Sequence, residues 1–374
     1  MIFEGGFVMS ENGPIRFFLG SNAPQGFVSR FDQLDCAEDW HTFIIKGGPG
    51  CGKSSLMRRI CSLFESRCPK MEQIVCSSDP DSLDAVILPE WKVSVADGTA
   101  PHILEPKLPA VCDSIVNLGE FLNQEKLYPH TRQLKQLQQH TAKNYTQASD
   151  CLNGAKTFLN ESSRIALACC DTEKLGAYAK HFSCRHFPSQ KGKNKRGKEQ
   201  IRFLSSVNAQ GVTSFYQTVK ALCPHICFFC DRYSAAAPLF LSALRSYALE
   251  NGYSVISCYC PIFPHTKIDH LLIPQIGLAV LTDNPFHNLS DLMPERRIHA
   301  KRFLETDRLR RYKKRLAFQQ KAAMQLIDQA VQILAENKQL HDETEQIYLQ
   351  AMDFSKMDDV TERLVFQITE RSRF

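Results

Sequence analysis

The chain has 374 residues, of which 43% are hydrophobic and 23% charged, and its formal net charge is +5. This length allows two or three domains with their own cores, and no apolar run approaches the roughly 18 residues that a membrane-spanning helix needs. The mild charge does not by itself indicate a nucleic-acid partner. Because the 15 cysteines lie in apolar stretches and the N-terminus lacks a signal-peptide pattern, we expect a reduced, cytoplasmic protein.

In chain order, a first strand is expected at 16–19, followed by a turn-rich loop at 20–27. The most informative stretch comes next, at His41–Phe64 (HTFIIKGGPGCGKSSLMRRICSLF). Its centre, Gly47–Ser54, fits G-x-x-x-x-G-K-[ST], the phosphate-binding P-loop. The apolar run 43–45 before the loop predicts a buried strand. After it, apolar residues at helical spacing predict a helix that buries Leu56, Met57, Ile60, Leu63 and Phe64.

Strand, glycine loop and helix together form the arrangement that binds a nucleoside triphosphate. Glycines let successive backbone N–H groups turn toward the phosphates, and the helix N-terminus adds partial positive charge. Lys53 is expected to reach the β- and γ-phosphates, Ser54 to ligate Mg²⁺, and Ser55 to contact the α-phosphate. The predicted nucleotide-binding residues are Gly47, Gly48, Pro49, Gly50, Cys51, Gly52, Lys53, Ser54 and Ser55.

Two aspartates are candidates for the remaining catalytic chemistry. Asp97 ends an apolar strand at 93–96 and is the candidate second Mg²⁺ ligand, as a Walker B aspartate is; the alternative is an aspartate that caps a turn. Asp79 follows a strand at 73–76 and is a candidate for positioning water or substrate, because loops after strand ends line the ligand crevice of α/β sheets. The Asp79–Pro80 pair is also ordinary turn chemistry.

The chain contains an internal repeat. Gly26 and Gly211 differ by 185 positions, and at the same offset LDAVILPEWKVSVADGTAPH aligns with IDHLLIPQIGLAVLTDNPFH. Asp84 and His102 recur as Asp269 and His287, which favours a structural role for both. The second copy reads FFCDRYSAAAPLF where the P-loop should be, and Ala237 or Pro238 takes the place of Lys53. We therefore predict a duplicated protein with one nucleotide site.

Helical patterns follow each predicted core, and hairpins were favoured over a long rod. The expected domains are a P-loop core at 1–105, a helical hairpin at 106–185, a basic linker at 186–200, a degenerate core at 201–295 and a second hairpin at 296–374. The predicted fold class is α/β, with a P-loop-type parallel sheet and flanking helices duplicated in tandem.

The strings CSSDPDSLDAVILPE and DGTAPH, together with the duplicated layout around a P-loop, resemble a largely uncharacterised bacterial family of two-copy P-loop ATP-binding proteins. The resemblance covers nearly the whole chain and implies ATP binding and ATPase activity, without naming a substrate. Members of that family often keep a GKS-type loop in the second half as well. This sequence departs from that pattern, which puts a second nucleotide site in doubt.

Three other features carry weaker hypotheses. Cys51 lies inside the P-loop, where helix-end amides would lower its pKa and make it a redox target. The run Cys223–Cys230 contains a C-x-x-C, but it lies in an apolar strand and has no matching second pair, so zinc is not expected. A basic cluster at 308–315 is expected to be a solvated face; an arginine finger acting in trans or a nucleic-acid contact is the alternative.

The sequence thus predicts a Mg²⁺-dependent ATPase with ATP and Mg²⁺ at one site. Lys53, Asp97 and Asp79 are the catalytic candidates, and Ser54 and Asp97 are the metal ligands. A P-loop kinase acting on a small molecule, or a nucleotide-gated switch with very slow turnover, remains the alternative. An unidentified protein or small-molecule partner is expected, and nucleic acid is not.

Overall fold

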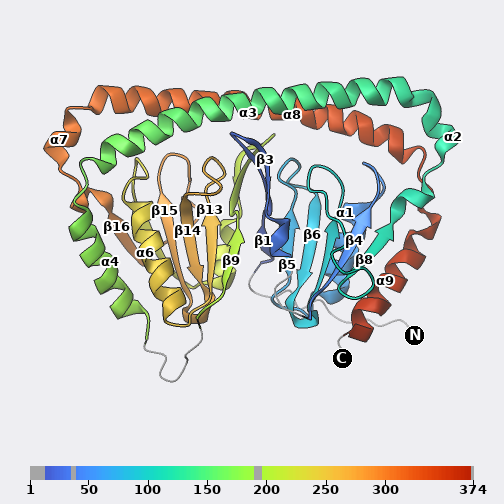
Figure 1. Cartoon of the computed structure of the whole chain (residues 1–374), viewed down its shortest axis with the longest axis horizontal. Coiled ribbons are helices and arrows are strands. Elements are labelled where there is room, and N and C mark those ends of the chain that lie inside the picture. Colours follow the sequence, from blue (N-terminus) through green and yellow to red (C-terminus); the bar gives the residue numbers. More distant parts are fainter. Residues whose placement is uncertain (1–12, 35–38, 189–195, 372–374) are drawn as a thin grey trace.

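A computed structural model describes residues 13–34, 39–188 and 196–371. Two six-stranded sheets stand side by side beneath a pair of long helices (Figure 1). The chain is therefore of the α/β class, as expected. Residues 189–195 of the predicted basic linker lie outside the described residues. None of the helices in the described ranges combines the length and apolar character required to cross a membrane.

The first sheet has the strand order β1-β5-β6-β7-β4-β8. Its strands are β1 (Ile15–Phe17), β5 (Glu72–Val75), β6 (Leu83–Leu88), β7 (Val93–Asp97), β4 (His41–Lys46) and β8 (Asp113–Asn117). The β1/β5, β4/β7 and β4/β8 pairs are parallel, whereas β6 is antiparallel to both its neighbours. The prediction of a parallel sheet is wrong at β6, because short turns join it to β5 and β7 and a parallel pair needs a long crossover.

The second sheet has the same order and the same strand directions, β9-β13-β14-β15-β12-β16. Its strands are β9 (Glu199–Arg202), β13 (Val255–Tyr259), β14 (Ile268–Ile273), β15 (Leu278–Asp283), β12 (His225–Cys230) and β16 (Arg296–His299). Each opening strand pairs within its own half, β1 with β5 and β9 with β13.

Two hairpins and a buried ion pair join the cores. Hairpin β2–β3 (Gly20–Ala23, Gly26–Ser29) lies beside hairpin β10–β11 (Ser205–Asn208, Gly211–Ser214). Phe18 and Phe203 exchange both backbone hydrogen bonds, at 2.9 and 3.0 Å. Arg202, whose side chain is fully buried, lies 2.9 Å from Glu72 in the other core. A charge without water needs such a partner, so the two halves are fixed against one another.

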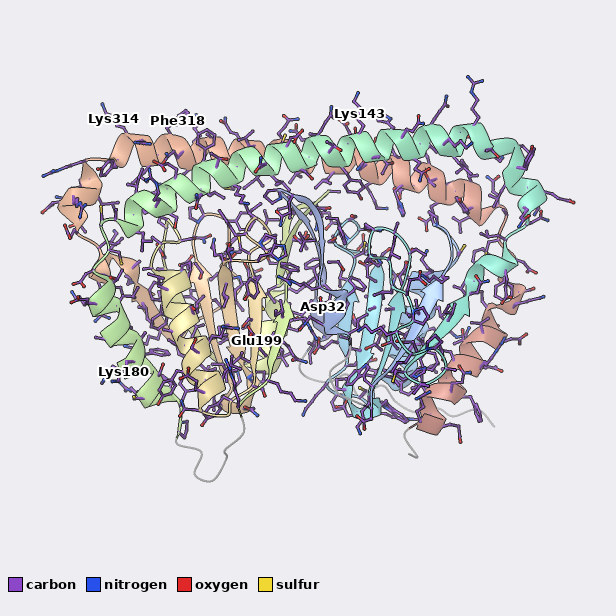
Figure 2. The ribbon with its side chains drawn as sticks, in the orientation of Figure 1. Asp32, Lys143, Lys180, Glu199, Lys314 and Phe318 are labelled. Atoms are coloured by element: carbon purple, nitrogen blue, oxygen red, sulfur yellow. The ribbon has the colours of Figure 1, made fainter. Side chains whose placement is uncertain are left out.

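The long helices α3 (Thr131–Leu167) and α8 (Lys313–Leu349) pack antiparallel across both cores (Figure 1). At 37 residues each, they are about 55 Å long. The expected separate hairpins are therefore wrong. Two polar residues of the α8 stripe pair across the seam, Gln319 with Ser162 and Asn337 with the Thr141 carbonyl. Lys143, Lys314 and Phe318 point away from the cores (Figure 2).

The last helix of each half of the chain packs on the core formed by the other half. Helix α4 (Thr172–His186) follows the first core but packs on α6 (Ala237–Glu250) of the second. The C-terminal α9 (Met357–Arg371) packs on α1 (Lys53–Phe64) of the first. Short helices occur at α2 (Gln124–Leu127), α5 (Tyr216–Leu222) and α7 (Thr306–Arg310). Short 3₁₀ turns occur at Phe31–Gln33, Pro89–Trp91, Leu118–Phe121, Tyr128–His130, Pro274–Ile276, Ala300–Phe303 and Phe354–Lys356.

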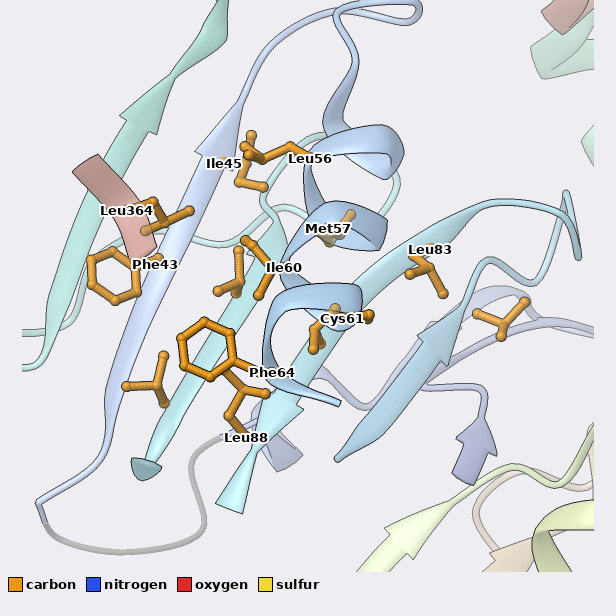
Figure 3. Packing of buried hydrophobic residues seen from close by; sticks show 14 of the residues in the cluster. Phe43, Ile45, Leu56, Met57, Ile60, Cys61, Phe64, Leu83, Leu88 and Leu364 are labelled. Atoms are coloured by element: carbon orange, nitrogen blue, oxygen red, sulfur yellow. The ribbon is translucent and has the colours of Figure 1, made fainter. Parts of the chain in front are cut away.

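The core under α1 positions the loop that precedes it. Leu56, Met57, Ile60 and Phe64 pack against Phe43, Ile45 and Leu88 of the sheet, and Leu364 of α9 closes the cluster (Figure 3). Leu63 was expected on the same face but is 48% exposed. The helix is therefore held on two sides, by its sheet and by the C-terminal helix.

Candidate functional site: a glycine loop at the edge of the first sheet

The loop Gly47–Gly52 connects the end of β4 to the first residue of α1. Gly50 (φ +70°) and Gly52 (φ +80°) adopt left-handed backbone conformations, which side-chain-bearing residues resist. Helix α1 begins directly at Lys53, and no side chain caps it. Its first N–H groups therefore face the loop, which is the arrangement that favours an anion.

Lys53 lies folded over the loop. Its ammonium donates hydrogen bonds to the carbonyls of Gly47 (2.8 Å) and Gly48 (2.7 Å), and it lies 3.5 Å from Oδ2 of Asp97. The parallel register pairs Ile45 with Asp97, which brings this aspartate beside the start of the loop. The other oxygen of Asp97 accepts hydrogen bonds from the N–H and hydroxyl of Thr99. Asp97 therefore caps a turn and faces Lys53 at the same time.

The Ser54 hydroxyl and Asp97 supply hard oxygen atoms of the kind that Mg²⁺ prefers. Ser54 accepts a hydrogen bond of 3.0 Å from the N–H of Leu83, which fixes its oxygen between α1 and β6. Ser55 is exposed. Within the described ranges, no cluster of three His, Cys, Asp or Glu side chains forms a metal site. A P-loop Mg²⁺ needs no such cluster, since phosphate oxygens and water complete its shell.

Asp79 is engaged by its surroundings. Its carboxylate accepts hydrogen bonds from the N–H of Asp81 and the hydroxyl of Ser82, as turn chemistry predicts. It also lies 3.3 Å from the ammonium of Lys338, which comes from α8. The arrangement ties the loop after β5 to the long helix, and it brings a lysine from the distant half to this edge of the sheet.

Asp84 and His102 form a buried pair beside the loop, 3.9 Å apart. Burial raises the pKa of Asp84 to about 6. The charged or titratable groups around this carboxyl are His102, Asp97, Cys76 and Lys53. The pair recurs in the second core, where Asp269 and His287 are 2.8 Å apart. Its presence in the core without a P-loop agrees with the structural role predicted for it.

The end of α8 and the start of α9 cover the glycine loop, a contact that the sequence analysis did not predict. A Cβ atom added to Gly48 would lie 2.9 Å from the ring of Tyr348, and one on Gly50 would lie 2.9 Å from the carbonyl of Glu345. At Gly52 the nearest atoms belong to Met357 and Phe354. The end of α8 and the start of α9 thus rest on the glycines. No local sequence signal predicts this contact, because about 300 positions separate the two segments.

Cys51 differs from its prediction. The side chain is fully buried, and burial raises the pKa of its thiol. Loss of hydration outweighs the favourable effect of the nearby Lys53. The expectation of a low-pKa, reactive cysteine is therefore wrong, because that chemistry needs an accessible thiolate.

The second core fills its equivalent loop with its own carboxylate. Strands β4 and β12 each have six residues, and six residues separate each from its helix, so Ala237 corresponds to Lys53 and Asp231 to Gly47. The Asp231 side chain is buried and accepts hydrogen bonds from the N–H groups of Ala236 (2.7 Å), Ala237 (2.9 Å) and Tyr233 (3.3 Å). A carboxylate therefore takes the place where a P-loop holds phosphate.

Other predicted features stay apart from this site. Cys227 and Cys230 lie on β12 among buried side chains, in agreement with a structural role. The basic cluster is partly neutralised, because Arg308 pairs with Glu305, Arg310 with Asp307 and Arg315 with Glu161. Such pairing is typical of a solvated face.

Comparison with protein-family models, with curated proteins and with solved structures finds no match for this chain. Its function is therefore inferred from its own residues and their geometry.

Proposed function

We propose that the chain binds Mg²⁺-ATP on Gly47–Ser55 of the first core and hydrolyses it, as a P-loop ATPase with one active site. The observation that carries this proposal is the position of Lys53, held by two loop carbonyls and 3.5 Å from the Walker B candidate Asp97. When phosphates enter, the ammonium can exchange these neutral carbonyls for phosphate oxygens. The ammonium then faces opposite charges instead of neutral carbonyl dipoles, and this added Coulomb attraction favours binding.

In hydrolysis, a water oxygen attacks the γ-phosphorus while the bond to the β–γ bridging oxygen breaks and ADP leaves. Mg²⁺, held by Ser54 and Asp97, would neutralise charge on the phosphate oxygens. Lys53 and the loop amides would stabilise the negative charge that develops toward the transition state. Lys338, which reaches Asp79 from α8, is a further cation near this edge. The choice of ATP over GTP rests on the family resemblance. The string Thr266–Asp269 (TKID) fits the guanine-reading N/TKxD pattern, but it lies in the second core, where Asp269 is buried and pairs with Lys267 and His287.

We further infer that the second core is a degenerate copy of the first. Identical strand order, identical directions and loops of equal length support this inference. The register that pairs Ile45 with Asp97 pairs Phe229 with Thr282, so the candidate metal ligand is absent there. Asp231 would also repel an incoming phosphate.

A nucleotide-gated switch is the second candidate function, favoured by one observation. Tyr348, Phe354 and Met357 rest on the glycine loop, so a bound nucleotide would contact or displace the end of α8 and the start of α9. Turnover that is very slow in the purified protein and rises only with a partner would distinguish this function from a simple ATPase.

The test is ATP binding and phosphate release with Mg²⁺, comparing the wild type with Lys53→Ala. We expect one ATP per chain, and an affinity lower by at least about tenfold in the variant, since a hydrogen bond to a charged group contributes about 1.5–3 kcal/mol. Lys92→Ala is the matched control, because Lys92 is exposed and, among the described residues, its side chain forms an ion pair only with Asp39. Binding without turnover favours the switch or a kinase, and no binding contradicts the proposal.

A further inference from the structure

A large chamber lies between the first core and the long helices, with a volume of about 1110 Å³. Its floor includes Pro49 of the glycine loop, Ala100 and Pro101 after β7, and the β2–β3 turn. Its roof is formed by α3 and the C-terminal half of α8. Ligand pockets typically have about 300–1,000 Å³, so this chamber is large enough for a small molecule. It adjoins the loop through Pro49, but Lys53, Ser54 and Asp97 do not line it.

The second core offers an internal comparison. Its equivalent cavity lies beneath the other end of the helix pair and measures only about 210 Å³. Tyr233 lies there at the position of Pro49, and Phe286 at the position of Pro101. Two aromatic rings thus occupy space that two prolines leave open. The chamber is large in the core that keeps the glycine loop and small in the core that has lost it, which links the chamber to the nucleotide site.

The chamber walls favour an uncharged ligand. Among the described residues that line it there is no arginine, and the charged side chains are Lys135 and Asp150, one of each sign. Aromatic rings line it at Phe27, Tyr128, Tyr145 and Tyr348. Flat apolar groups pack on such rings. An anionic ligand would need more positive charge than these walls supply.

The chamber lining includes a residue with a buried hydrogen-bond acceptor. Asn337 lines the chamber and is only 3% exposed; its Nδ2 donates to the Thr141 carbonyl at 3.2 Å. Its Oδ1 has no hydrogen-bond partner among the described residues. A buried oxygen without a partner costs about 1–3 kcal/mol, so a ligand that brings an O–H or N–H donor would be favoured.

We propose that this chamber is a second small-molecule site, which binds an uncharged, ring-bearing compound with hydroxyl or amino donors beside the nucleotide. The inference rests on the proposed function, because the glycine loop defines the neighbouring nucleotide site. A compound held there would lie next to the phosphates, where an effector or a phosphoryl acceptor has to be. The competing occupant is the nucleoside end of the nucleotide itself.

The test narrows the chamber and measures two ligands separately. Ala142→Trp on α3 and His341→Trp on α8 place a bulky ring at the chamber wall; both positions are exposed, so both variants should fold. Gln147→Trp is the control, an exposed position of α3 outside the lining. Calorimetry measures ATP and inorganic tripolyphosphate on each variant. A panel of adenosine, guanosine, uridine, glucose and myo-inositol is then titrated into the protein saturated with tripolyphosphate, and into the protein saturated with ATP.

We expect a panel compound to bind the wild type and the control in both saturated forms, and to bind both chamber variants at least about tenfold more weakly. ATP affinity should stay the same in all four proteins. If ATP weakens in the chamber variants while tripolyphosphate does not, the chamber holds the nucleoside end and the second site is refuted. Binding of no panel compound to the wild type also refutes it. Failure of the wild type to bind ATP or tripolyphosphate would instead contradict the proposed function.

Discussion

Replacing Asp231 with alanine should show how the second core satisfies the backbone N–H groups at the start of α6. The carboxylate is 1% exposed and accepts three backbone hydrogen bonds at the start of α6. Alanine removes all three and leaves the N–H groups of Ala236 and Ala237 buried without acceptors. Loss of a helix cap costs about 1 kcal/mol, and each unsatisfied buried group about 1–3 kcal/mol. The cap and the unsatisfied groups describe the same lost interaction, so the two buried N–H groups set the expected decrease in the free energy of unfolding, about 2–6 kcal/mol.

Asp171→Ala provides the matched control. Asp171 also caps a helix, but it is exposed and makes one hydrogen bond, of 2.9 Å, to the N–H of Lys174. Its replacement should cost about 1 kcal/mol, because water can satisfy the freed N–H group. Both substitutions remove the same side chain from a helix N-terminus. The difference between them therefore reports the buried anion site rather than the loss of an aspartate.

The measurement is amide hydrogen exchange in peptides of α6, combined with urea unfolding. Both tryptophans of the chain, Trp40 and Trp91, come from the first half, and Trp40 packs in a cluster shared by both halves, so exchange in α6 is the measurement that reports the second core. Added sulfate should partly restore protection in Asp231→Ala, since a free anion can bind where the carboxylate was. If Asp231→Ala destabilises α6 no more than Asp171→Ala destabilises α4, the carboxylate does not replace phosphate and the reasoning fails.

Two further substitutions and one labelling experiment test the first core. A left-handed alanine costs about 1–2 kcal/mol. Gly50→Ala should lower the free energy of unfolding by more than this, because its Cβ would also lie 2.9 Å from the Glu345 carbonyl. A free energy of unfolding equal to that of the wild type would contradict the packing of α8 on the loop. Burial raises the pKa of Asp84 from 3.8 to about 6, so the folded protein binds a proton at a higher pH than the unfolded chain does. The stability that this group contributes is therefore present at low pH and is lost as the pH rises through 6. Between pH 7.5 and 4.5 the wild type should gain about 2 kcal/mol relative to Asp84→Asn in urea unfolding, and parallel pH profiles would refute this. Cys51 is buried with a raised pKa, so iodoacetamide should modify it much more slowly than the exposed Cys184, as mass spectrometry of timed samples can check.

The loop and its flanking elements were predictable because their signals are local. The expected strand at 43–45 lies within β4, and the helix expected after the loop is α1. The strand before Asp97 is β7, and the position of Asp97 beside the loop follows from parallel pairing with β4. Apolar periodicity also identified the buried stripe of α3 at Ala148, Leu152 and Ala155. Spacing along the chain carries this information directly.

The positions of α4 and α9, each of which packs on the core of the other half, were not predictable in the same way. Amphipathic periodicity gives one apolar face to a helix but does not say which surface covers it. Helix α9 lies next in sequence to the second core, yet its buried Leu364 and Ile368 join the cluster around α1. A local hairpin and a crossing pair bury similar stripes, so the pattern alone favoured the shorter connection. The contact of Tyr348 with Gly48 follows from this crossing and shares its lack of a local signal.

The two loops differ in whether the chain itself supplies an acceptor for the N–H groups at the start of the following helix. In the second core, the Asp231 side chain accepts hydrogen bonds from the N–H groups at the start of α6, so these groups have an acceptor without any ligand. In the first core, the same place holds Gly47, and its cation, Lys53, rests on neutral carbonyls 2.7 and 2.8 Å away. If the proposed nucleotide binds, its phosphate oxygens would add stability in the first core and none in the second. Because α8 and α9 rest on the first loop, ligand binding there would also stabilise these two helices, which join the two halves.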